Sequence, residues 1–496
     1  MPREPRHLAP WIAAGVAIVG GLIWAICFGR HGFLFLPWVA LTPLILLVDQ
    51  RRAPLWGFLH GLATWLLAIP WIGPTISTYG ELPGWLGGLV LVLLSSYLAL
   101  YHCLFAWLAR AMWTRGSLSL SLVGLPALWT SLEVLRQYLV TGFPWNLASY
   151  AWVEVPGALL LSSWIGAFGV SFVVLVPSVG LAQGITRRRW EPAAVGFLVP
   201  LLLLALAVRF AKPQSPDSPA REVRLIQPNV PILMASQTEE QGRHYRRLLQ
   251  LSDEACDQPA LLVWPESAAW PYAFSRDARL QEDVRRLTDG GCSLLLNSPR
   301  WQGEEVFNTA FLAQPGGALE IYDKRHLVPF GEYVPFAGVL PFVGNLARNA
   351  GSFSASEDAR LLSWQGERIG MAICFEIIFP HEVAALVANG ATLIATITND
   401  GWYGDTWAPW QHLRAARFRA AENRRPVLRA ALTGITALIA SDGQTLHAVG
   451  IDREGIVRAT VVGTGQLSPY TRMPWLAPFL CLAIASFAIL STRRGP

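Results

Sequence analysis

The segment Ile369-Gly-Met-Ala-Ile-Cys374-Phe-Glu376-Ile-Ile-Phe-Pro380 decides both the fold class and the chemistry expected of this chain. Its apolar beginning, residues 369–373, predicts a buried strand, and Pro380 predicts that a helix begins just beyond the turn. Cys374 closes the strand, where nearby bases and backbone N–H groups can activate a thiol. A buried structural cysteine is the alternative interpretation, and this segment alone does not exclude it.

Strands and helices alternate on both sides of this segment. The sequence predicts helices at 239–255, 276–288, 380–389 and 410–424, and strands at 223–230, 260–264, 293–297, 306–312, 368–374, 391–398, 427–440 and 451–462. Continuous apolar strands between helices indicate an α/β fold with a sheet covered by helices. About 260 residues suit one such domain, which opens with a Pro- and Ser-rich linker at 212–220.

A carboxylate, Glu266, follows the predicted strand in Leu261-Leu-Val-Trp-Pro-Glu266. Enzymes built on such sheets usually keep their functional side chains where strands end. Apolar neighbours raise the pKa of a carboxyl group, so Glu266 is a candidate general base. A helix cap or a surface glutamate is the alternative interpretation.

Lys324 is unusual because 37 of the 39 basic residues are Arg, and Lys212 is the only other lysine. It lies in Tyr322-Asp-Lys324-Arg-His-Leu-Val-Pro-Phe-Gly-Glu332-Tyr-Val-Pro335. An ammonium is a compact charge with a movable pKa, so Lys324 suits the stabilisation of an oxyanion or a carboxylate. Chance retention of a surface lysine is the alternative, and Glu332 is either a site residue or a solvated loop charge.

The first part of the chain is composed like a membrane protein. Hydrophobic residues make up 53% of the sequence and charged residues only 15%, against about 25% charged residues in a typical soluble protein. Only 18 of the 73 charged residues fall within 1–211. We therefore expect a membrane domain at 1–211, a catalytic domain at 212–472, and a last membrane helix with a short tail at 473–496.

A helix that spans a membrane needs about 20 apolar residues. Eight windows free of charge meet or approach this length: 8–29, 31–48, 53–80, 82–109, 117–132, 155–186, 192–208 and 473–492. Eleven arginines gather on one side of these spans: 3, 6, 51, 52, 110, 115, 187, 188, 189, 493 and 494. The positive-inside rule then predicts cytoplasmic termini and places residues 212–472 in the periplasm of a two-membrane bacterium.

Net charge and cysteine spacing argue against three features: nucleic-acid binding, a metal site and a disulfide framework. The net charge is +5, and the arginines lie at the ends of segments rather than on one basic face, so nucleic-acid binding has no support. The six cysteines form no CxxC pair and no metal-ligand spacing. We expect neither a metal site nor a disulfide framework, which leaves room for a single functional thiol.

Together, the three segments resemble the nitrilase superfamily, whose Glu, Lys and Cys occur in the chain order of Glu266, Lys324 and Cys374. A nitrilase-like domain between a seventh and an eighth membrane helix resembles the apolipoprotein N-acyltransferase family over essentially the whole chain. Further matching motifs are the loop 322–332, Cys374-Phe-Glu376, Asn399-Asp-Gly-Trp-Tyr-Gly404 and Gly142-Phe-Pro-Trp-Asn146. The resemblance implies an α-β-β-α sandwich inserted in a polytopic helical membrane domain of eight spans.

The resemblance also implies a reaction in the lipid bilayer. An acyl chain passes from a phospholipid, preferably phosphatidylethanolamine, to Cys374 as a thioester. It then passes to the α-amine of the diacylglyceryl-Cys at the N-terminus of an apolipoprotein. In this reaction Glu266 is the general base, and Lys324 with the backbone N–H of Phe375 stabilises the oxyanion. The residues that match supporting or substrate positions are Glu332, Glu376, Trp402 and Tyr403, and the resemblance implies no cofactor and no metal.

The chain departs from this family at two places. The segment Asn229–Gln237 lacks the Trp that the family shows shortly after Asn-Val-Pro, so a lid contact around Ser236 is undefined. In Arg429-Ala-Ala-Leu-Thr-Gly434, Leu432 stands where the family tends to have Asn, which removes a polar side chain from a loop. Neither departure changes the three residues expected to carry the reaction.

Other functions stay open at this point. A membrane-anchored amidase or nitrilase-type hydrolase would use the same three residues, although hydrolysis of small amides needs neither seven preceding spans nor the Trp-rich loop 400–410. A transporter or lipoprotein-binding scaffold is a further alternative. Two observations speak against it: the predicted spans carry few charges, and the chain shows no internal repeat. An amine acceptor other than an apolipoprotein also stays open.

Overall fold

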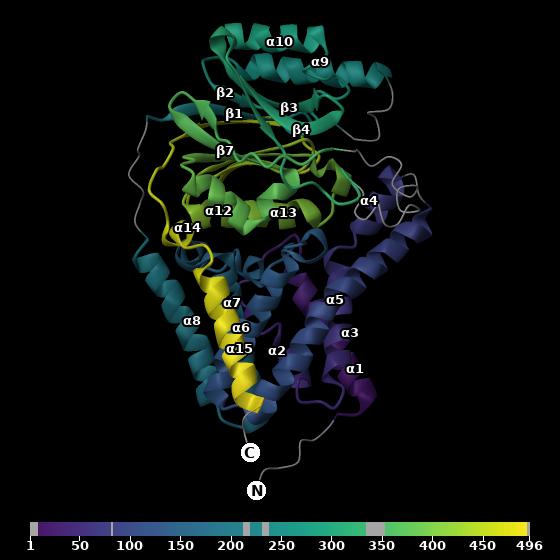
Figure 1. Cartoon of the computed structure of the whole chain (residues 1–496), viewed down its shortest axis with the longest axis vertical. Coiled ribbons are helices and arrows are strands. Elements are labelled where there is room, and N and C mark those ends of the chain that lie inside the picture. Colours follow the sequence, from purple (N-terminus) through teal and green to yellow (C-terminus); the bar gives the residue numbers. More distant parts are fainter. Residues whose placement is uncertain (1–7, 81–82, 212–218, 231–237, 334–352, 494–496) are drawn as a thin grey trace. The chain divides into compact units, whose positions relative to one another are not determined.

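Figure 1 shows the computed structural model of the chain, which describes residues 8–80, 83–211, 219–230, 238–333 and 353–493. The chain divides into two compact units. Unit 1 comprises Met1–Thr78, Leu82–Lys212 and Met473–Pro496, and unit 2 comprises Tyr79–Glu81 and Pro213–Arg472. Most of the expected linker, the arginines at 3, 6 and 494, and the Ser236 region lie outside the described residues.

Unit 1 is helical, because apolar segments in lipid must pair their backbone polar groups internally. Its helices are α1 (Pro10–Ile26), α2 (Thr42–Leu47), α3 (Ala53–Ala68), α4 (Ile72–Tyr79), α5 (Gly84–Arg115), α6 (Leu118–Arg136), α7 (Ala158–Arg187), α8 (Glu191–Arg209) and α15 (Leu476–Arg493). Small residues let these helices approach closely. A Cβ on Gly57 of α3 would lie 2.5 Å from the carbonyl oxygen of His102 on α5.

Among the described residues, fewer helices are long and apolar enough to cross a membrane alone than the eight spans expected from the sequence. By length and composition, α5, α6, α7 and α8 can each cross a membrane, and the pair α3 and α4, bent by 54°, adds a fifth crossing if it is one span. Three shorter apolar helices, Pro10–Ile26, Leu36–Leu47 and Leu476–Thr492, fall in other expected spans. At about 1.5 Å per residue, helices of 17 residues or fewer fall short of the roughly 30 Å hydrocarbon core.

Two buried charges on α6 hold the loop that follows this helix. Glu133 accepts hydrogen bonds from Nε1 of Trp129 at 3.1 Å and from the backbone N–H of Ala148 at 2.8 Å. Arg136 donates to the carbonyl oxygen of Trp145 at 2.9 Å. These contacts fix the Phe-Pro-Trp loop, so the two charges have a structural role within unit 1.

The described part of unit 2 contains two six-stranded sheets, ordered β12-β1-β2-β3-β4-β5 and β11-β10-β9-β8-β7-β6. The strands are β1 (Arg221–Gln227), β2 (Leu261–Val263), β3 (Ser293–Gln302), β4 (Glu305–Ala313), β5 (Leu319–Asp323), β6 (Leu362–Trp364), β7 (Glu367–Ile373), β8 (Leu393–Thr398), β9 (Val427–Ala431), β10 (Thr436–Ile439), β11 (Thr445–Val449) and β12 (Gly455–Val461). Each sheet contains three neighbouring parallel strands: β1, β2 and β3 in the first sheet, and β7, β8 and β9 in the second. Their continuous apolar sequences fit this position, because parallel strands are covered on both faces.

Helices cover the outer face of each sheet, so unit 2 has four layers in the order α-β-β-α (Figure 1). The helices α9 (Thr238–Ala255) and α10 (Ala278–Asp289) lie over the first sheet, and α12 (Pro380–Ala388) and α13 (Ala408–Asn423) lie over the second. One apolar core lies between the sheets and includes Leu225 and Met371. A second core lies under α9 and α10 and includes Leu248.

The end of the sheet region differs from the sequence prediction. The single strand expected at 427–440 is two antiparallel strands, β9 and β10, joined by a tight turn. Gly434 permits this turn, because a Cβ there would lie 2.5 Å from Oδ2 of Asp400. The strands β5, β6 and β11 were not predicted, since β6 is only three residues long and β11 is exposed for most of its length.

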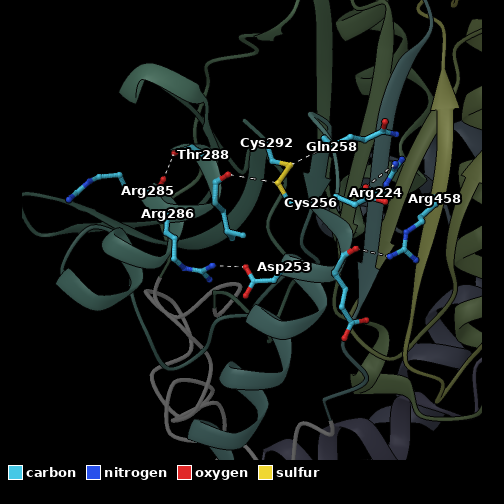
Figure 2. Close-up of a disulfide and its surroundings, with 12 residues drawn as sticks. Arg224, Asp253, Cys256, Gln258, Arg285, Arg286, Thr288, Cys292 and Arg458 are labelled. Atoms are coloured by element: carbon cyan, nitrogen blue, oxygen red, sulfur yellow. Dashed lines mark hydrogen bonds and ion pairs between the residues drawn. A yellow bond between two sulfur atoms is a disulfide. The ribbon is translucent and has the colours of Figure 1, made fainter. Parts of the chain in front are cut away.

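The sequence predicts no disulfide framework, and the described residues contain one isolated disulfide. Cys256, directly after α9, is bonded to Cys292, directly before β3 (Figure 2). Their Cα atoms are 6.1 Å apart, which suits a disulfide. Sequence spacing did not reveal the pair, because the two residues meet only when α9 packs on the first sheet. The described free thiols are Cys27, Cys103, Cys374 and Cys481.

Candidate active site

Cys374 begins the short 3₁₀ helix η6 (Cys374–Ile378), directly after β7 ends. Its φ angle is +53°, a left-handed conformation that costs a residue other than glycine of order 1–3 kcal/mol. The residue is 5% exposed. A sharp turn out of a buried strand therefore presents the thiol where the strand ends, which is the position that the sequence predicts.

Glu376 holds this turn in place. Its Oε2 accepts a hydrogen bond from the backbone N–H of Ile373 at 2.7 Å. Its Oε1 accepts from the backbone N–H groups of Arg325 at 2.7 Å and His326 at 3.1 Å, and from the hydroxyl of Tyr322 at 3.0 Å. Burial raises the pKa of the Glu376 carboxyl group to about 7. Glu376 thus joins the turn at the nucleophile to the loop that carries Lys324.

Glu266 follows β2 and is 6% exposed. Its Oε2 accepts a hydrogen bond from the backbone N–H of Asn399 at 3.0 Å, and its Oε1 accepts from Nδ2 of Asn308 at 2.9 Å. The Nζ atom of Lys324 lies 3.6 Å from the same Oε1. Three segments that are far apart in the sequence therefore meet at this carboxylate.

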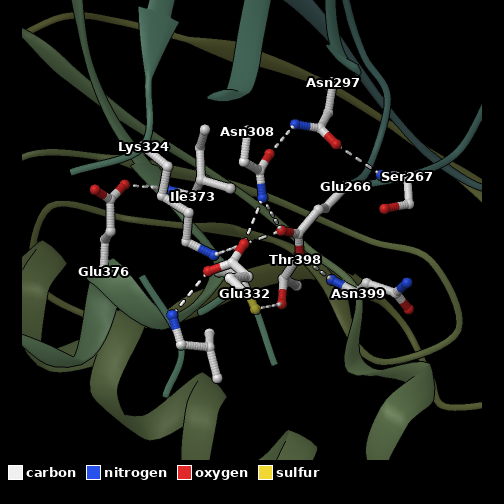
Figure 3. A network of polar contacts seen from close by, with 12 residues as sticks. Glu266, Ser267, Asn297, Asn308, Lys324, Glu332, Ile373, Glu376, Thr398 and Asn399 are labelled. Carbon is white, nitrogen blue, oxygen red and sulfur yellow. Dashed lines mark hydrogen bonds and ion pairs between the residues drawn. The ribbon is translucent and has the colours of Figure 1, made fainter. Parts of the chain in front are cut away.

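Lys324 follows β5 and is fully buried. Its Nζ donates a hydrogen bond to Oε1 of Glu332 at 2.9 Å, in addition to the contact with Glu266 (Figure 3). Burial alone would lower the pKa of Lys324, but the carboxylates of Glu332 and Glu266 outweigh burial and hold it above its ordinary value. The amine is therefore a fixed positive charge next to the thiol.

Asn308, on β4, is a site residue that the sequence analysis missed. Its Nδ2 donates to Glu266 at 2.9 Å and to Glu332 at 2.7 Å, and its Oδ1 accepts from Nδ2 of Asn297 at 2.7 Å (Figure 3). An amide inside an otherwise apolar strand was the available signal. We call Glu266, Lys324, Glu332 and Asn308 the acid–base cluster.

The charges around Cys374 favour its protonated form. Burial raises the pKa of the thiol, and the carboxylate of Glu266 raises it further, while Lys324 acts in the opposite direction. The acid–base cluster contains two carboxylates and one ammonium, so its net charge opposes a thiolate. Glu266 can thus receive the thiol proton at the moment of attack, rather than stabilise a permanent thiolate.

A second polar network, also missed by the sequence analysis, lies next to the nucleophile. Asp400 binds Arg429 through Oδ2 at 2.5 Å and His412 through Oδ1 at 3.0 Å. The Nε2 atom of His412 lies 3.0 Å from the carbonyl oxygen of Cys374. Burial would raise the pKa of Asp400, but Arg429 and His412 outweigh it and hold this pKa at about 2. We call Asp400, His412 and Arg429 the Asp400 network.

The remaining predicted residues lie around these groups. Phe375 is buried directly after the nucleophile, where the first N–H groups of a helix have no partner within the helix. Burial raises the pKa of the Tyr403 hydroxyl well above its ordinary value, and Cys374, Asp400 and Glu266 lie near enough to raise it further. Trp402 is 39% exposed in the short helix Asp400–Tyr403.

Leu432 acts through its backbone and not through a polar side chain. Its N–H donates to the carbonyl oxygen of Thr398 at 3.1 Å, and its own carbonyl accepts from the N–H of Asn229 at 3.0 Å. The side chain is buried in the apolar core that lies between the first sheet and the helices α9 and α10. Among the described residues, no group of three or more His, Cys, Asp or Glu side chains is arranged to hold a metal ion.

Two helix-covered sheets, with a glutamate, a lysine and a cysteine meeting at strand ends, define a protein of the nitrilase superfamily. Residues 222–468 match the carbon–nitrogen hydrolase family model, and residues 20–180 match the model of the apolipoprotein N-acyltransferase N-terminal domain. The chain belongs to the apolipoprotein N-acyltransferase family, a family of membrane enzymes of lipoprotein biosynthesis.

Relatives of the same name match the chain over nearly its full length. The apolipoprotein N-acyltransferase of Geobacter metallireducens is 38% identical and covers 97% of this chain and 95% of the relative. That of Allorhizobium ampelinum is 30% identical and covers 91% and 90%. A solved structure of a mutant amidase from Nesterenkonia sp. is 22% identical, with a TM-score of 0.37, and covers 51% of this chain and 96% of the amidase.

Proposed function

We propose that this enzyme transfers a fatty acyl chain from a phospholipid, through a thioester on Cys374, to the N-terminal amine of the diacylglyceryl-Cys of an apolipoprotein. The observation that supports this most directly is the buried acid–base cluster beside the turn at Cys374. Phosphatidylethanolamine is the proposed donor, and no cofactor takes part. The full-length family match supports a lipoprotein substrate and a membrane lipid context.

In the first half-reaction, Glu266 takes the thiol proton as Sγ of Cys374 attacks the ester carbonyl carbon of the phospholipid. The carbonyl oxygen becomes an oxyanion, which the ammonium of Lys324 and the backbone N–H of Phe375 stabilise. The C–O bond then breaks, and Glu266 returns the proton to the leaving oxygen. A lysophospholipid departs, and the acyl chain remains on sulfur.

In the second half-reaction, the apolipoprotein amine attacks the thioester carbonyl carbon. Glu266 takes a proton from the amine, and the same donors stabilise the new oxyanion. The C–S bond breaks, Sγ recovers its proton from Glu266, and the amide product leaves. Glu332 and Glu376 keep the lysine loop and the nucleophile turn in position throughout, and Trp402 and Tyr403 contact the lipid substrates.

We also propose the bacterial inner membrane as the location, with eight spans, both termini in the cytoplasm, and residues 212–472 in the periplasm. The Cys256–Cys292 disulfide supports this orientation, because such bonds persist in oxidising compartments and are rare in the cytosol. Alkylation of whole cells after acid quenching tests it. The peptides containing these two cysteines should remain disulfide-linked, and two free thiols there would contradict the orientation.

The acyl intermediate can be tested by intact mass. We expect the purified protein, incubated in detergent with phosphatidylethanolamine, to gain the mass of one acyl chain. Neutral hydroxylamine should remove this mass, and the Cys374→Ala variant should never acquire it. An unmodified Cys374 after incubation with phospholipid would contradict the proposal.

A membrane-anchored amidase or nitrilase-type hydrolase is the alternative. Addition of a diacylated lipopeptide separates the two activities. An acyltransferase converts it into a triacylated lipopeptide, whereas a hydrolase releases free fatty acid or ammonia and leaves the lipopeptide unchanged.

A further inference from the structure

Thr398 is a buried hydroxyl that touches the nucleophile. It is the last residue of β8 and is fully buried. Its Oγ1 lies 3.3 Å from Sγ of Cys374, which is within the hydrogen-bond range for sulfur (Figure 3). The proposed mechanism assigns it no role, although the sulfur must carry negative charge at two points of the reaction.

The same hydroxyl has a second acceptor. Oγ1 of Thr398 lies 2.9 Å from Oδ1 of Asp400. A hydroxyl has one proton, so Thr398 can donate to either Asp400 or Cys374 at a given moment. Asp400 retains the hydrogen bond from Arg429 in both cases. Withdrawal of the Thr398 proton therefore leaves no buried carboxylate without a partner.

We propose that Thr398 is a further catalytic residue, whose hydroxyl rotates from Asp400 to Sγ whenever the sulfur becomes negative. Next to a neutral thiol, the carboxylate is the better acceptor and holds the proton. When Sγ becomes a thiolate, the O–H turns toward it and forms a charge-assisted hydrogen bond. This inference rests on the proposed thioester function of Cys374.

The rotation adds no proton to the chemistry. In acylation, Glu266 removes the thiol proton and Thr398 donates a hydrogen bond to the sulfur as its electron pair attacks. In deacylation, the C–S bond breaks, its electron pair returns to Sγ, and Thr398 donates again until Glu266 returns the proton. The bond from Thr398 stabilises the sulfur, whereas Lys324 stabilises the oxygen of the substrate.

The geometry of the turn is consistent with stabilisation of the sulfur by Thr398 and of the substrate oxygen by Lys324. The carbonyl oxygen of Cys374 lies 3.0 Å from Nε2 of His412, so the Asp400 network holds the backbone of the nucleophile in place. The sulfur therefore stays within reach of the hydroxyl. An apolar replacement of the same shape removes the hydrogen bond without leaving a cavity.

The test measures the sulfur itself, independently of acyl transfer. Wild-type, Thr398→Val and Thr398→Ser proteins, each full-length in detergent, are alkylated with iodoacetamide at several pH values, and modification of the peptide containing Cys374 is followed by mass spectrometry. Alkylation requires the thiolate, so its rate reports stabilisation of negative sulfur. We expect Thr398→Val to react about tenfold more slowly at each pH, and Thr398→Ser to react within about threefold of wild type.

The outcomes separate the possible roles. If Thr398→Val keeps the wild-type alkylation rate and only its melting temperature falls, the hydroxyl serves Asp400 alone and the proposal is wrong. Should the valine variant not fold, Thr398→Ala compared with Thr398→Ser makes the same distinction. If wild-type Cys374 never forms an acyl adduct, the proposed function fails, while the alkylation result still decides whether Thr398 stabilises the thiolate.

Discussion

Two buried polar networks contact the segment around Cys374, and they differ in the balance of their charges. The acid–base cluster has two carboxylates, Glu266 and Glu332, for the single ammonium of Lys324. The Asp400 network has one carboxylate, which binds both Arg429 and His412. Both networks are almost completely excluded from water.

This difference shows that burial alone does not assign a role to a carboxylate. The acid–base cluster has one carboxylate more than it has ammonium groups, so one carboxylate can accept a proton, as a general base must. The fully paired carboxylate of the Asp400 network has a pKa of about 2 and keeps the same charge across the physiological range. The first network can exchange a proton, whereas the second holds the backbone in place.

Removal of the only cation from the acid–base cluster should have the largest effect. We expect Lys324→Met to reduce acyl transfer by about 10³-fold, since an oxyanion donor is lost. We also expect it to destabilise the protein by about 3–5 kcal/mol, because two buried carboxylates lose their counter-charge. Single-turnover acyl transfer and the melting temperature in detergent measure the two effects.

A second substitution sharpens this prediction. In Lys324→Met/Glu332→Gln one of the two unpaired carboxylates is gone, so part of the stability should return. Activity should stay low, because the oxyanion still lacks its ammonium. Recovery of acyl transfer in the double variant would show that Lys324 only balances the charge of Glu332.

In the Asp400 network, replacement of the cation Arg429 should lower the stability of the protein much more than its activity. Arg429→Met removes the guanidinium that pairs with the Asp400 carboxylate and should cost about 3–5 kcal/mol. Arg429 does not touch the thiol, so the protein that remains folded should lose only about tenfold in acyl transfer. If Arg429→Met lost as much acyl transfer as Lys324→Met and kept the wild-type melting temperature, the proposed difference between the two networks would be wrong.

Glu376 provides a third carboxylate and a prediction about pH. Its described hydrogen bonds come from neutral N–H and O–H groups, and burial raises its pKa to about 7 from about 4.5 in an unfolded chain. Between these values the folded protein binds more protons than the unfolded one, so stability falls as the pH rises. The loss of stability caused by Glu376 should be complete above about pH 7 and amount to roughly 3 kcal/mol.

The measurement compares the melting temperatures of wild type and Glu376→Gln between pH 5 and pH 8. Wild type should become less stable over this range, and the variant should show a flatter profile. The variant should also be less active, because its NH₂ group must face a backbone N–H donor. Equal pH profiles would show that Glu376 keeps an ordinary pKa.

The smallest expected effect belongs to Asn308, which supplies no charge. Asn308→Ala removes hydrogen bonds to two carboxylates and should cost about 2 kcal/mol and roughly tenfold in activity. Asn297→Ala is the matched control, since Asn297 contacts Asn308 but neither carboxylate in the described structure. Equal activity losses in both variants would assign Asn308 to the strands and not to the site.

Much of unit 2 was predictable because its central strands are continuous apolar runs that each end in a conspicuous residue. Glu266, Lys324 and Cys374 stand out in the sequence for this reason. Asn308 and Asp400 do not, because their importance arises from contacts with residues far along the chain. The turn at Gly434 was hidden because apolar residues continue across it and resemble one longer strand.

The membrane region shows a different limit. Its apolar windows are clear in the sequence, and they coincide with helices. Hydropathy does not reveal where a helix bends, as it does between α3 and α4, nor that α1 has only 17 residues. Window length therefore overestimates the number of helices that are long enough to cross a bilayer alone.

The Cys256–Cys292 bond has a consequence for the order in which unit 2 matures. A chain is synthesised from its N-terminus, so both of these cysteines are available before Cys374 exists. Their union closes a ring of chain that already contains Glu266. Once this bond has formed, the two other cysteines of unit 2 can no longer pair with Cys374, and its sulfur is left for the substrate.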